Sequence, residues 1–436
     1  MRGSSRRGER SDLVAYVVAV RLFSRNARLY ILHVIGMDMI HGTWLVLFNL
    51  YLLAIGLDIK FVGLRILLGG LAGAVAAVPA GFVSDRIGRK WSFILGDGGG
   101  ATLGVISILS TDGPLLLATA VLGGFFGTLH EVSESPFMVE NSEPPERVHL
   151  FSVATGLRTG SAMVGSLVAG FVPMLAMHLA DSVSLYRAAT LIGLAVWGLS
   201  LIPALLLHTV ATGVEGRARP GIGGLLQNLR HRQRIGRLVA VSAITALGFG
   251  FVGPLFNVFY HEGLHAHVRA IGLTFASGEF FLAVAALLAP FLAARMSKVQ
   301  AIAGTRLLAV PFILVIGLSP NLATVTDVLT LAGAAYVARI VLSNAAGPLG
   351  EAFAMEILDP GERSTMVGLR SAAWQVLAAV GGFSGAQLMS GGDFFTPFVA
   401  MASLYALGAI LFWLWFRPLE QAMPPAQALL GLDAAS

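Results

Sequence analysis

Apolar stretches of about 20 residues recur along this chain, and each is long enough to cross a bilayer as a helix. They fall near residues 29–55, 62–83, 91–110, 114–138, 149–177 and 185–208, then near 236–260, 268–293, 299–319, 325–355, 364–390 and 394–416. Lipid offers no partners to backbone N–H and C=O groups, so only helices and closed barrels span it. The sequence therefore predicts an all-α membrane protein of twelve transmembrane helices.

Composition supports this reading and excludes several others. Of the 436 residues, 56% are hydrophobic and 12% are charged, where a soluble protein would carry about a quarter charged residues. Because the apolar stretches recur, a signal peptide does not explain them. The chain has no cysteine, which excludes disulfides, thiolate catalysis and cysteine metal sites. Its net charge of +5 comes from arginines between the apolar stretches, so no nucleic-acid partner is expected.

A polar, arginine-containing segment at 209–235 divides the stretches into six and six. We therefore expect a surface arm at 1–28, a six-helix bundle at 29–208, a linker at 209–235, a second bundle at 236–416 and a tail at 417–436. Basic residues gather on the side of the linker, which predicts that both termini are cytoplasmic. The preference for Arg, Ala and Gly points to a bacterial plasma membrane.

The two halves repeat one another. Asn49, near the end of the first stretch, is matched 208 residues later by Asn257 near the end of the seventh. Glu140 and Arg147 are matched 216 residues later by Glu356 and Arg363. Six helices per half keep both copies in one orientation, as in parallel repeats about an axis along the membrane normal.

The segment between the second and third stretches reads Gly-Phe-Val-Ser-Asp-Arg-Ile-Gly-Arg-Lys. An ordinary basic loop would explain its arginines but not an acid with two glycines. Its defined positions are Gly81, Asp85, Arg86, Gly88, Arg89 and Lys90. This segment resembles the signature loop of the major facilitator superfamily, and the second copy, around Lys298, lacks the acid and the second glycine.

The resemblance implies two six-helix bundles that rock around a central site. It also implies a conformational latch on the cytoplasmic side, in which Arg86 or Arg89 pairs with Glu140 and Asp85 faces the region of Ser364. The repeated loops add Arg147, Glu356 and Arg363 to the expected latch. No nucleotide-binding motif appears, so an ion gradient is the expected energy source.

Ionisable residues inside the stretches are the expected coupling and binding groups. Asp38 lies near the middle of the first helix with no evident partner, and we predict it, with Glu131 and Glu134, to carry protons. By the resemblance, the substrate cavity would include His41, Asn257, Tyr336 and Arg339. Glu279, an ionisable residue near the midplane of the eighth stretch, is a further predicted cavity residue.

Structural roles compete with these assignments. Glu279 and Arg339 could neutralise one another, and the two asparagines could finish helix ends. His33 is expected to bond a neighbouring carbonyl. The residues Asp97, Arg158 and Arg370 are expected to tie helices together.

The segment His261-Glu262-Gly263-Leu264-His265 spells a zinc-protease pattern, but we expect it in a short external loop, where the pattern arises by chance. We therefore expect a monomeric, proton-coupled exporter of small apolar or amphipathic compounds, with no metal, no cofactor and no enzymatic activity. Proton-coupled uptake of a small polar or anionic solute is the alternative within transport. A membrane metallohydrolase and a scaffold without transport are the alternatives of other classes.

Overall fold

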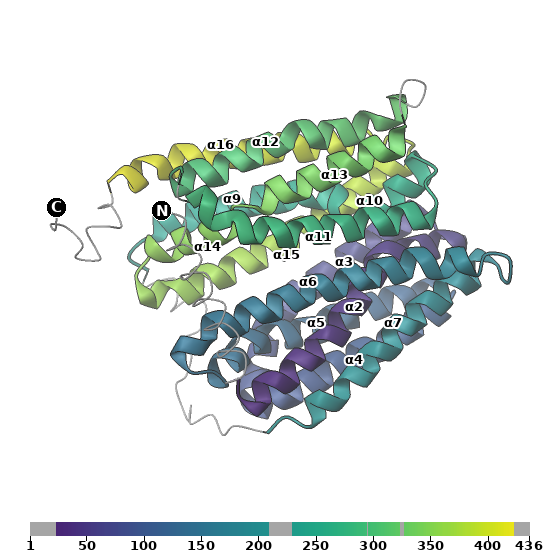
Figure 1. Cartoon of the computed structure of the whole chain (residues 1–436), viewed down its shortest axis with the longest axis horizontal. Coiled ribbons are helices and arrows are strands. Elements are labelled where there is room, and N and C mark those ends of the chain that lie inside the picture. Colours follow the sequence, from purple (N-terminus) through teal and green to yellow (C-terminus); the bar gives the residue numbers. More distant parts are fainter. Residues whose placement is uncertain (1–22, 209–228, 294, 323–326, 423–436) are drawn as a thin grey trace, which may run out of the picture. The chain divides into compact units, whose positions relative to one another are not determined.

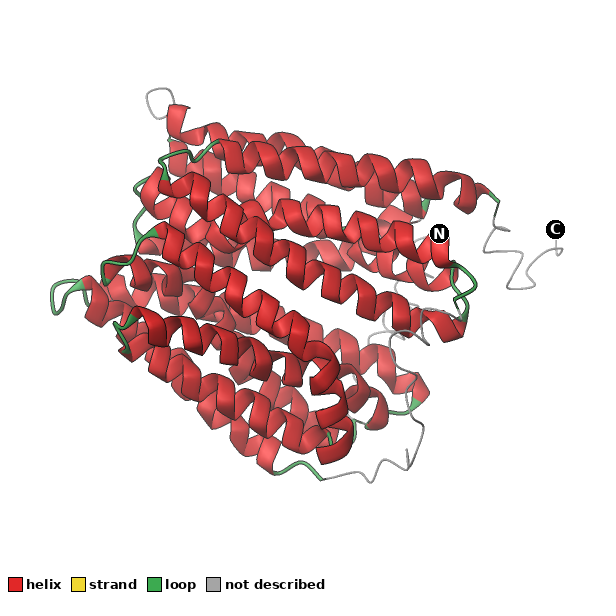
Figure 2. Cartoon of the chain, turned by 180° about the vertical axis from the view of Figure 1, so that it is seen from behind, coloured by secondary structure: helices red, strands yellow, loops and turns green. Residues whose placement is uncertain are grey.

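A computed structural model describes residues 23–208, 229–293, 295–322 and 327–422. These residues form helices joined by short loops, and no strand occurs among them (Figure 2). Most of the predicted N-terminal arm, most of the linker and the end of the tail lie outside the described residues.

The helices of Figure 1 follow the predicted stretches. The first half contains α2 (Arg25–Ala54), α3 (Ile59–Ile87), α4 (Arg89–Leu109), α5 (Gly113–Glu140), α6 (Pro144–Leu175) and α7 (Ser182–Leu205). The second contains α9 (Arg232–Val252), α10 (Phe256–Val258), α11 (Val268–Ala293), α12 (Lys298–Leu318), α13 (Val328–Asn344), α14 (Gly347–Glu356), α15 (Pro360–Ser390) and α16 (Thr396–Gln421).

Within the described ranges, ten helices are long and apolar enough to cross a membrane. Two further helices, α6 with 32 residues and α15 with 31, are long enough and contain more polar residues. Together they account for the twelve predicted transmembrane helices, and the all-α membrane fold is confirmed.

Local chemistry sets where the helices begin and break. Side chains of Ser24, Asp58 and Asp112 each accept a hydrogen bond from a backbone N–H in the first turn of the helix that follows. Gly253-Pro254 interrupts the seventh span, which continues as a 3₁₀ turn at Gly253–Leu255, then α10, then a π-helical turn at Phe259–Gly263. Proline lacks the N–H that a continuous helix needs, so α9 ends there.

The chain forms two compact units. The first contains residues up to 218 together with 254–280, and the second contains 219–253 and 281 onward. The boundary at 253/254 coincides with the break after α9. Residues 254–280 thus pack with the first half, although they follow the linker in sequence. The six-and-six division of the chain remains a prediction.

The same close crossing of two helices occurs once in each unit, at positions related by the repeat. In the first unit, a Cβ added to Gly42 would lie 1.9 Å from the Ala162 carbonyl oxygen, and one added to Gly165 would lie 1.9 Å from that of Met39. In the second, a Cβ added to Gly250 would lie 2.3 Å from the Ala378 carbonyl oxygen, and one added to Gly381 would lie 2.4 Å from that of Leu247. Any side chain at these positions would separate α2 from α6 or α9 from α15. The shared geometry explains why small residues recur at the repeat spacing.

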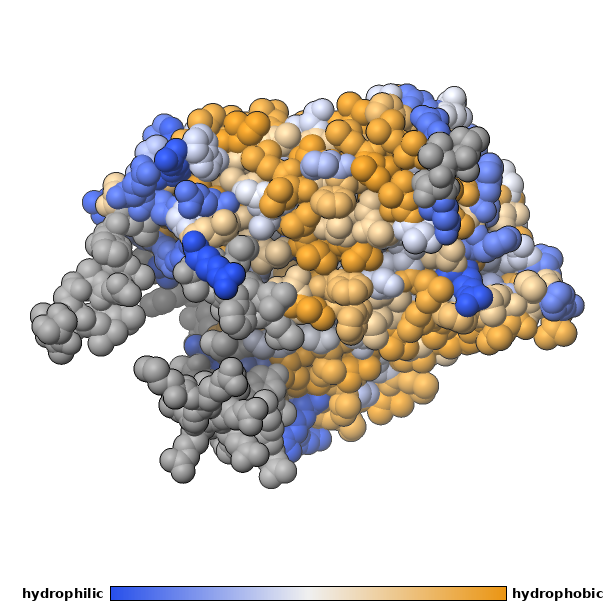
Figure 3. Space-filling view, turned by 45° about the horizontal axis from the view of Figure 1, so that its top comes forward, coloured by the Kyte–Doolittle hydropathy of each residue, from blue (hydrophilic) through white to orange (hydrophobic). Residues whose placement is uncertain are grey.

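Apolar side chains are abundant on the outside of these helices (Figure 3). Val75 on α3, Leu199 on α7 and Leu308 on α12 are each more than half exposed. In a soluble protein such surfaces would promote aggregation, whereas lipid solvates them.

Candidate functional site

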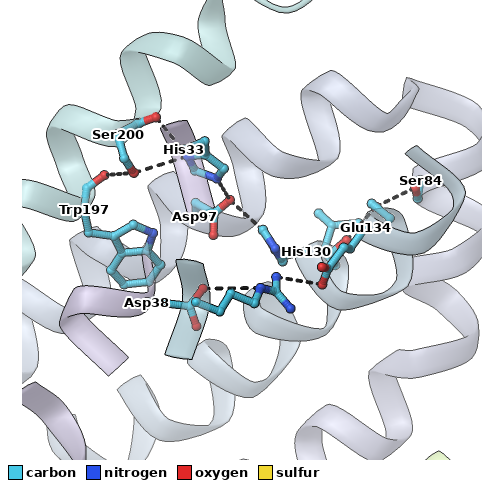
Figure 4. Close-up of polar contacts among 11 residues, drawn as sticks. His33, Asp38, Ser84, Asp97, His130, Glu134, Trp197 and Ser200 are labelled. Atoms are coloured by element: carbon cyan, nitrogen blue, oxygen red, sulfur yellow. Dashed lines mark hydrogen bonds and ion pairs between the residues drawn. The ribbon is translucent and has the colours of Figure 1, made fainter. Parts of the chain in front are cut away.

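An arginine shared by two acids lies inside the first unit. Arg158 of α6 places its Nε 3.4 Å from Asp38 Oδ2 of α2 and its Nη2 2.8 Å from Glu134 Oε2 of α5 (Figure 4). The Asp38 contact is an ion pair without hydrogen-bond geometry, since neither of its two atoms finds a hydrogen-bond partner. Three helices therefore meet at one cation with two carboxylates, an arrangement that carries one surplus negative charge.

This geometry changes the expected role of two residues. Asp38 has a partner, contrary to the prediction, and Arg158 is that partner in addition to joining helices. The depth count that placed Asp38 near the middle of its helix could have found Arg158 as well. Arg158 lies nine residues into the predicted 149–177 stretch, about 14 Å at 1.5 Å per residue, and thus close to the middle of the bilayer.

A buried histidine–aspartate–histidine cluster adjoins this group. Asp97 Oδ2 on α4 lies 2.9 Å from His33 Nε2 and 2.8 Å from His130 Nδ1, and His33 Nδ1 lies 2.8 Å from the Ser200 carbonyl oxygen (Figure 4). The Ser200 hydroxyl donates to the Trp197 carbonyl, so it is not a donor to His33. Both nitrogens of His33 face acceptors, and the bonding is satisfied when His33 donates from both.

The cluster confirms that His33 bonds a carbonyl and that Asp97 joins three helices. Its three ligand atoms lie within 4.8 Å of one another, close enough for a metal ion, as do those of His231, Asp359 and Glu362 in the second unit. Hydrogen bonds already account for the geometry of both groups. The buried Nε2 of His130 has no hydrogen-bond partner among the described residues.

A cavity of about 290 Å³ opens beside these groups, entirely within the first unit. Asp38, Asp97, His130 and Glu131 line it together with His41, and most of its remaining wall is apolar. Two predicted proton carriers, Asp38 and Glu131, and one predicted cavity residue, His41, therefore share one space. Arg65 and Trp44 also line it, and the sequence reasoning assigned no role to either.

The other predicted cavity residues lie elsewhere. In the first unit, Asn257 of α10 donates to the Val46 carbonyl and accepts from Asn49, with distances of 3.1 and 3.0 Å, while Glu279 of α11 is half-buried. In the second unit, Tyr336 and Arg339 of α13 are buried, and the Arg339 guanidinium lies 6.0 Å from the ring centre of Phe249.

The predicted latch loop connects α3 to α4. Gly88 takes a positive φ of 85° at the junction, a conformation that favours glycine. Arg89 contacts Asp85 at 2.8 Å, Glu140 at 3.3 Å and the Ser84 hydroxyl at 2.6 Å, so Arg89 and not Arg86 meets Glu140. Gly81 lies within α3 and Lys90 within α4, and both are half-buried, so the predicted loop is helical except at Gly88.

The second unit holds a simpler version of this arrangement. Lys298 contacts the Glu356 carboxylate at 2.6 Å. Arg363 donates to the Leu358 carbonyl at 3.3 Å, and its counterpart in the first unit, Arg147, donates to the Val139 carbonyl at 3.5 Å.

The zinc-protease pattern does not form the geometry that it requires. His261 and Glu262 lie in the π-helical turn, which ends at Gly263, and His265 follows with a positive φ of 51°. This segment is partly helical where a loop was expected, yet the two histidines do not share one continuous helix, as such a zinc site would need.

Comparisons with known proteins agree on one family. The sequence model of the Major Facilitator Superfamily matches residues 27–338 and 238–431. No curated protein sequence matches the chain. The structure is similar to a D-xylose-proton symporter, with a TM-score of 0.70, 14% identity and coverage of 91% of this chain and 97% of that one.

Two further solved structures show the same likeness. The nucleoside transporter NupG, as a D323A mutant, has a TM-score of 0.69 at 14% identity, covering 89% of this chain and 99% of that one. A bacterial homologue of the human lysosomal transporter Spinster has a TM-score of 0.66 at 15% identity, covering 92% and 98%. At these identities the likeness establishes the fold. With its signature loop, its repeat and the family match across most of its length, this chain belongs to the Major Facilitator Superfamily and is a transporter rather than an enzyme.

Proposed function

We propose that this transporter is a proton-coupled secondary carrier of small amphipathic compounds that works by alternating access. The observation that carries the proposal is the sharing of Arg158 by Asp38 and Glu134. One guanidinium neutralises one carboxylate, so the group is charge-balanced when one proton is bound and carries excess negative charge when none is. In lipid that difference is large enough to favour proton uptake at one stage of a transport cycle.

Movement follows from the same geometry. With a proton on Asp38, Arg158 is free to pair with Glu134 alone, and the ion pair between Asp38 and Arg158 is released. Without that proton, Arg158 contacts both Asp38 of α2 and Glu134 of α5. A proton thereby changes which helices the arginine joins, while α2 and α6 stay packed at Gly42 and Gly165. We propose this change of contacts as the coupling that alternating access requires. Glu131 in the cavity wall and His130 beside Glu134 are the reserve proton carriers.

Contacts at the two ends of the first unit fit such a cycle. The Arg89 group lies at the end where α3 meets α4, whereas the Asn49–Asn257 hydrogen bonds lie at the opposite end, near the C-terminus of α2. Exposed ion pairs contribute about 1 kcal/mol or less each, so a few of them bias two states without freezing either. We propose that the first group is a cytoplasmic latch and that the asparagines tie the outer end.

The proposed orientation has both termini in the cytoplasm of a bacterial cell. Single cysteines at positions 216 and 263 of this cysteine-free chain test it with an impermeant maleimide on intact cells. Position 263 should react and position 216 should not. The reverse pattern would invert the proposed topology.

Uptake of a small anionic solute is the second candidate, because the cavity wall contains Arg65, which has no acidic partner among the described residues. Solid-supported-membrane electrophysiology on proteoliposomes distinguishes the candidates when a panel of neutral, anionic and cationic amphipathic compounds is applied with and without a pH gradient. If an inward proton gradient drives accumulation of the compound, the transporter is a symporter. If the same gradient drives efflux of the compound, it is an antiporter. Transport currents that are the same with and without a pH gradient would contradict proton coupling.

A further inference from the structure

Arg65 of α3 is a cation without a counter-ion among the described residues. Its guanidinium carbon lies 4.2 Å from the ring centre of Phe48 and 5.6 Å from that of Trp44. These two rings stack on each other with centres 3.8 Å apart. The Nε atom is sealed from solvent and bonds nothing, and no acid lies within ion-pair distance of Arg65 in the part of the chain that is described.

Cation–π contacts offset only part of the cost of such a charge. They contribute about 0.5–2 kcal/mol, whereas removing an ion from water carries a penalty of several kcal/mol. A guanidinium also offers five N–H donors in a planar fork that matches a carboxylate. The aromatic rings cover a face of the guanidinium and accept no conventional hydrogen bond from its N–H edge, so an anion is the missing partner.

The surroundings of Arg65 indicate what kind of anion fits. Arg65 lines the cavity of about 290 Å³, whose exposed wall is mainly apolar. The indole Nε1 of Trp197, in the same wall, is a second buried donor without a partner. Buried donors are rarely left unsatisfied, so two of them in one cavity point to a ligand that accepts hydrogen bonds.

The acids of this cavity lie too far along the helices to neutralise Arg65. The Thr128 hydroxyl of α5 donates to the Gly73 carbonyl of α3, so these two residues lie at the same depth. Gly73 is eight residues after Arg65 on α3, which corresponds to about 12 Å along the helix axis. His130 and Glu131 follow Thr128 on α5 and lie two and three residues further from Arg65. The cavity therefore has a cationic end at Arg65 and a proton-accepting end at Asp38, His130 and Glu131.

We propose that this cavity binds a small organic anion, with its carboxylate on the Arg65 guanidinium and its apolar body against Trp44 and Leu103. The proposal deepens the transport function proposed above and rests on it for its biological meaning. The binding itself needs no proton gradient. The cavity volume of about 290 Å³ is at the lower end of the range for small-molecule sites, so the ligand is a small one, and a body of one aromatic ring or a short alkyl chain fits.

The test is equilibrium binding to the purified full-length protein in detergent, by isothermal titration calorimetry and thermal shift. The probes are 3-phenylpropanoate, its neutral amide and the matching amine, with hexanoate as a second carboxylate and sodium chloride as an inorganic anion. The carboxylates should bind at least tenfold more tightly than the amide and the amine. Arg65→Gln should remove this preference, and Arg65→Lys should retain part of it.

Two control variants distinguish a loss of binding from a loss of folding. Arg269 on α11 also lies over an aromatic ring, 5.4 Å from the centre of Phe171, but it is exposed and outside the cavity, so Arg269→Gln should bind as the wild type does. Gly123 lines the cavity, and a Cβ there meets nothing within 4 Å. Gly123→Leu should therefore fold, keep Arg65 and lose the carboxylates because it fills their space.

Several results would overturn the inference. They are equal binding of carboxylate, amide and amine, unchanged carboxylate binding in Arg65→Gln, binding of chloride alone, or no binding of either carboxylate at millimolar concentration. Because these measurements use no pH gradient, a transporter that binds carboxylates but ignores protons would contradict the coupling proposal and leave this one standing.

Discussion

Arg158 on α6 and Arg370 on α15 lie on corresponding helices of the two halves, yet they are paired differently. Arg370 holds one acid through two contacts, with Nη1 and Nη2 at 3.2 and 2.9 Å from the Glu351 carboxylate, and its Nε donates to Ser242. Arg158 is divided between Asp38 and Glu134. A closed bidentate pair is balanced and geometrically fixed, whereas a shared arginine leaves one acid in surplus. Under the proposed mechanism, this difference assigns proton coupling to the first unit.

The largest expected effect comes from removing the shared cation. Arg158→Leu leaves two carboxylates without a partner in lipid, and breaking a buried pair in this way costs about 3–5 kcal/mol. Gradient-driven transport should be abolished and the melting temperature in detergent should fall. Arg370→Leu, whose acid is more than half exposed, should lower both much less.

A triple variant separates stability from coupling. Replacing Asp38, Glu134 and Arg158 with Asn, Gln and Leu removes all three charges, so the melting temperature should recover while proton-driven transport stays lost. Recovery of both would show that the group only holds the helices together.

Loss of the basic residue in the predicted latch should also impair transport more in the first unit than in the second, although by less than loss of Arg158 does. Arg89 contacts two acids and a serine, whereas Lys298 contacts Glu356. Loss of about 1 kcal/mol changes the ratio of two states about fivefold. Arg89→Ala should therefore slow transport several-fold and shift spin-label distances between cytoplasmic helix ends toward the inward-open population.

The matching variant Lys298→Ala should change both transport and the distance distribution by less than Arg89→Ala does. Equal effects in the two variants would mean that the first loop has no special part in the cycle.

The smallest effect concerns the start of α9 in the second unit. Burial would raise the pKa of Glu362, but hydrogen bonds from the backbone N–H of His231, its ring and the N–H of Arg230 hold the pKa below its usual range. A depressed carboxyl pKa stabilises the fold above the unfolded value of about 4.3, and this contribution disappears as pH falls through the lower folded value. Glu362→Gln should lower the melting temperature slightly at pH 7.

That difference between Glu362→Gln and the wild type should shrink in acid, which thermal unfolding at pH 7 and at about pH 3.5 would measure. A gap that stays constant with pH would mean that the charge of Glu362 contributes nothing to stability.

The helices and the family were predictable because their signals are local. Twenty-residue apolar stretches and the 81–90 loop require no knowledge of neighbours, and the match of Glu140 and Arg147 to Glu356 and Arg363 is visible by alignment of the chain with itself. The close crossings at Gly42 and Gly250 follow the same repeat spacing.

Side-chain partners were not predictable in this way. Asp38 and Arg158 are 120 residues apart, and only the packing of α2 against α6 brings them together. Arg65 near the start of α3 carries no sequence signal that separates it from an ordinary interfacial arginine. Its significance depends on its cation–π contacts with Phe48 and Trp44 and on the lack of an acid within ion-pair distance in the described ranges.

The proposed coupling requires that Asp38 exchange a proton while it shares Arg158 with Glu134, and one measurement tests this most directly. Proteoliposomes with Asp38→Asn are compared with wild type and with Glu351→Gln, using a compound that the wild type transports, for accumulation after a pH step and for exchange without a gradient. Asparagine mimics the protonated acid, so Asp38→Asn should lose accumulation and keep exchange, while Glu351→Gln should keep both. Accumulation against a concentration gradient by Asp38→Asn would contradict the account.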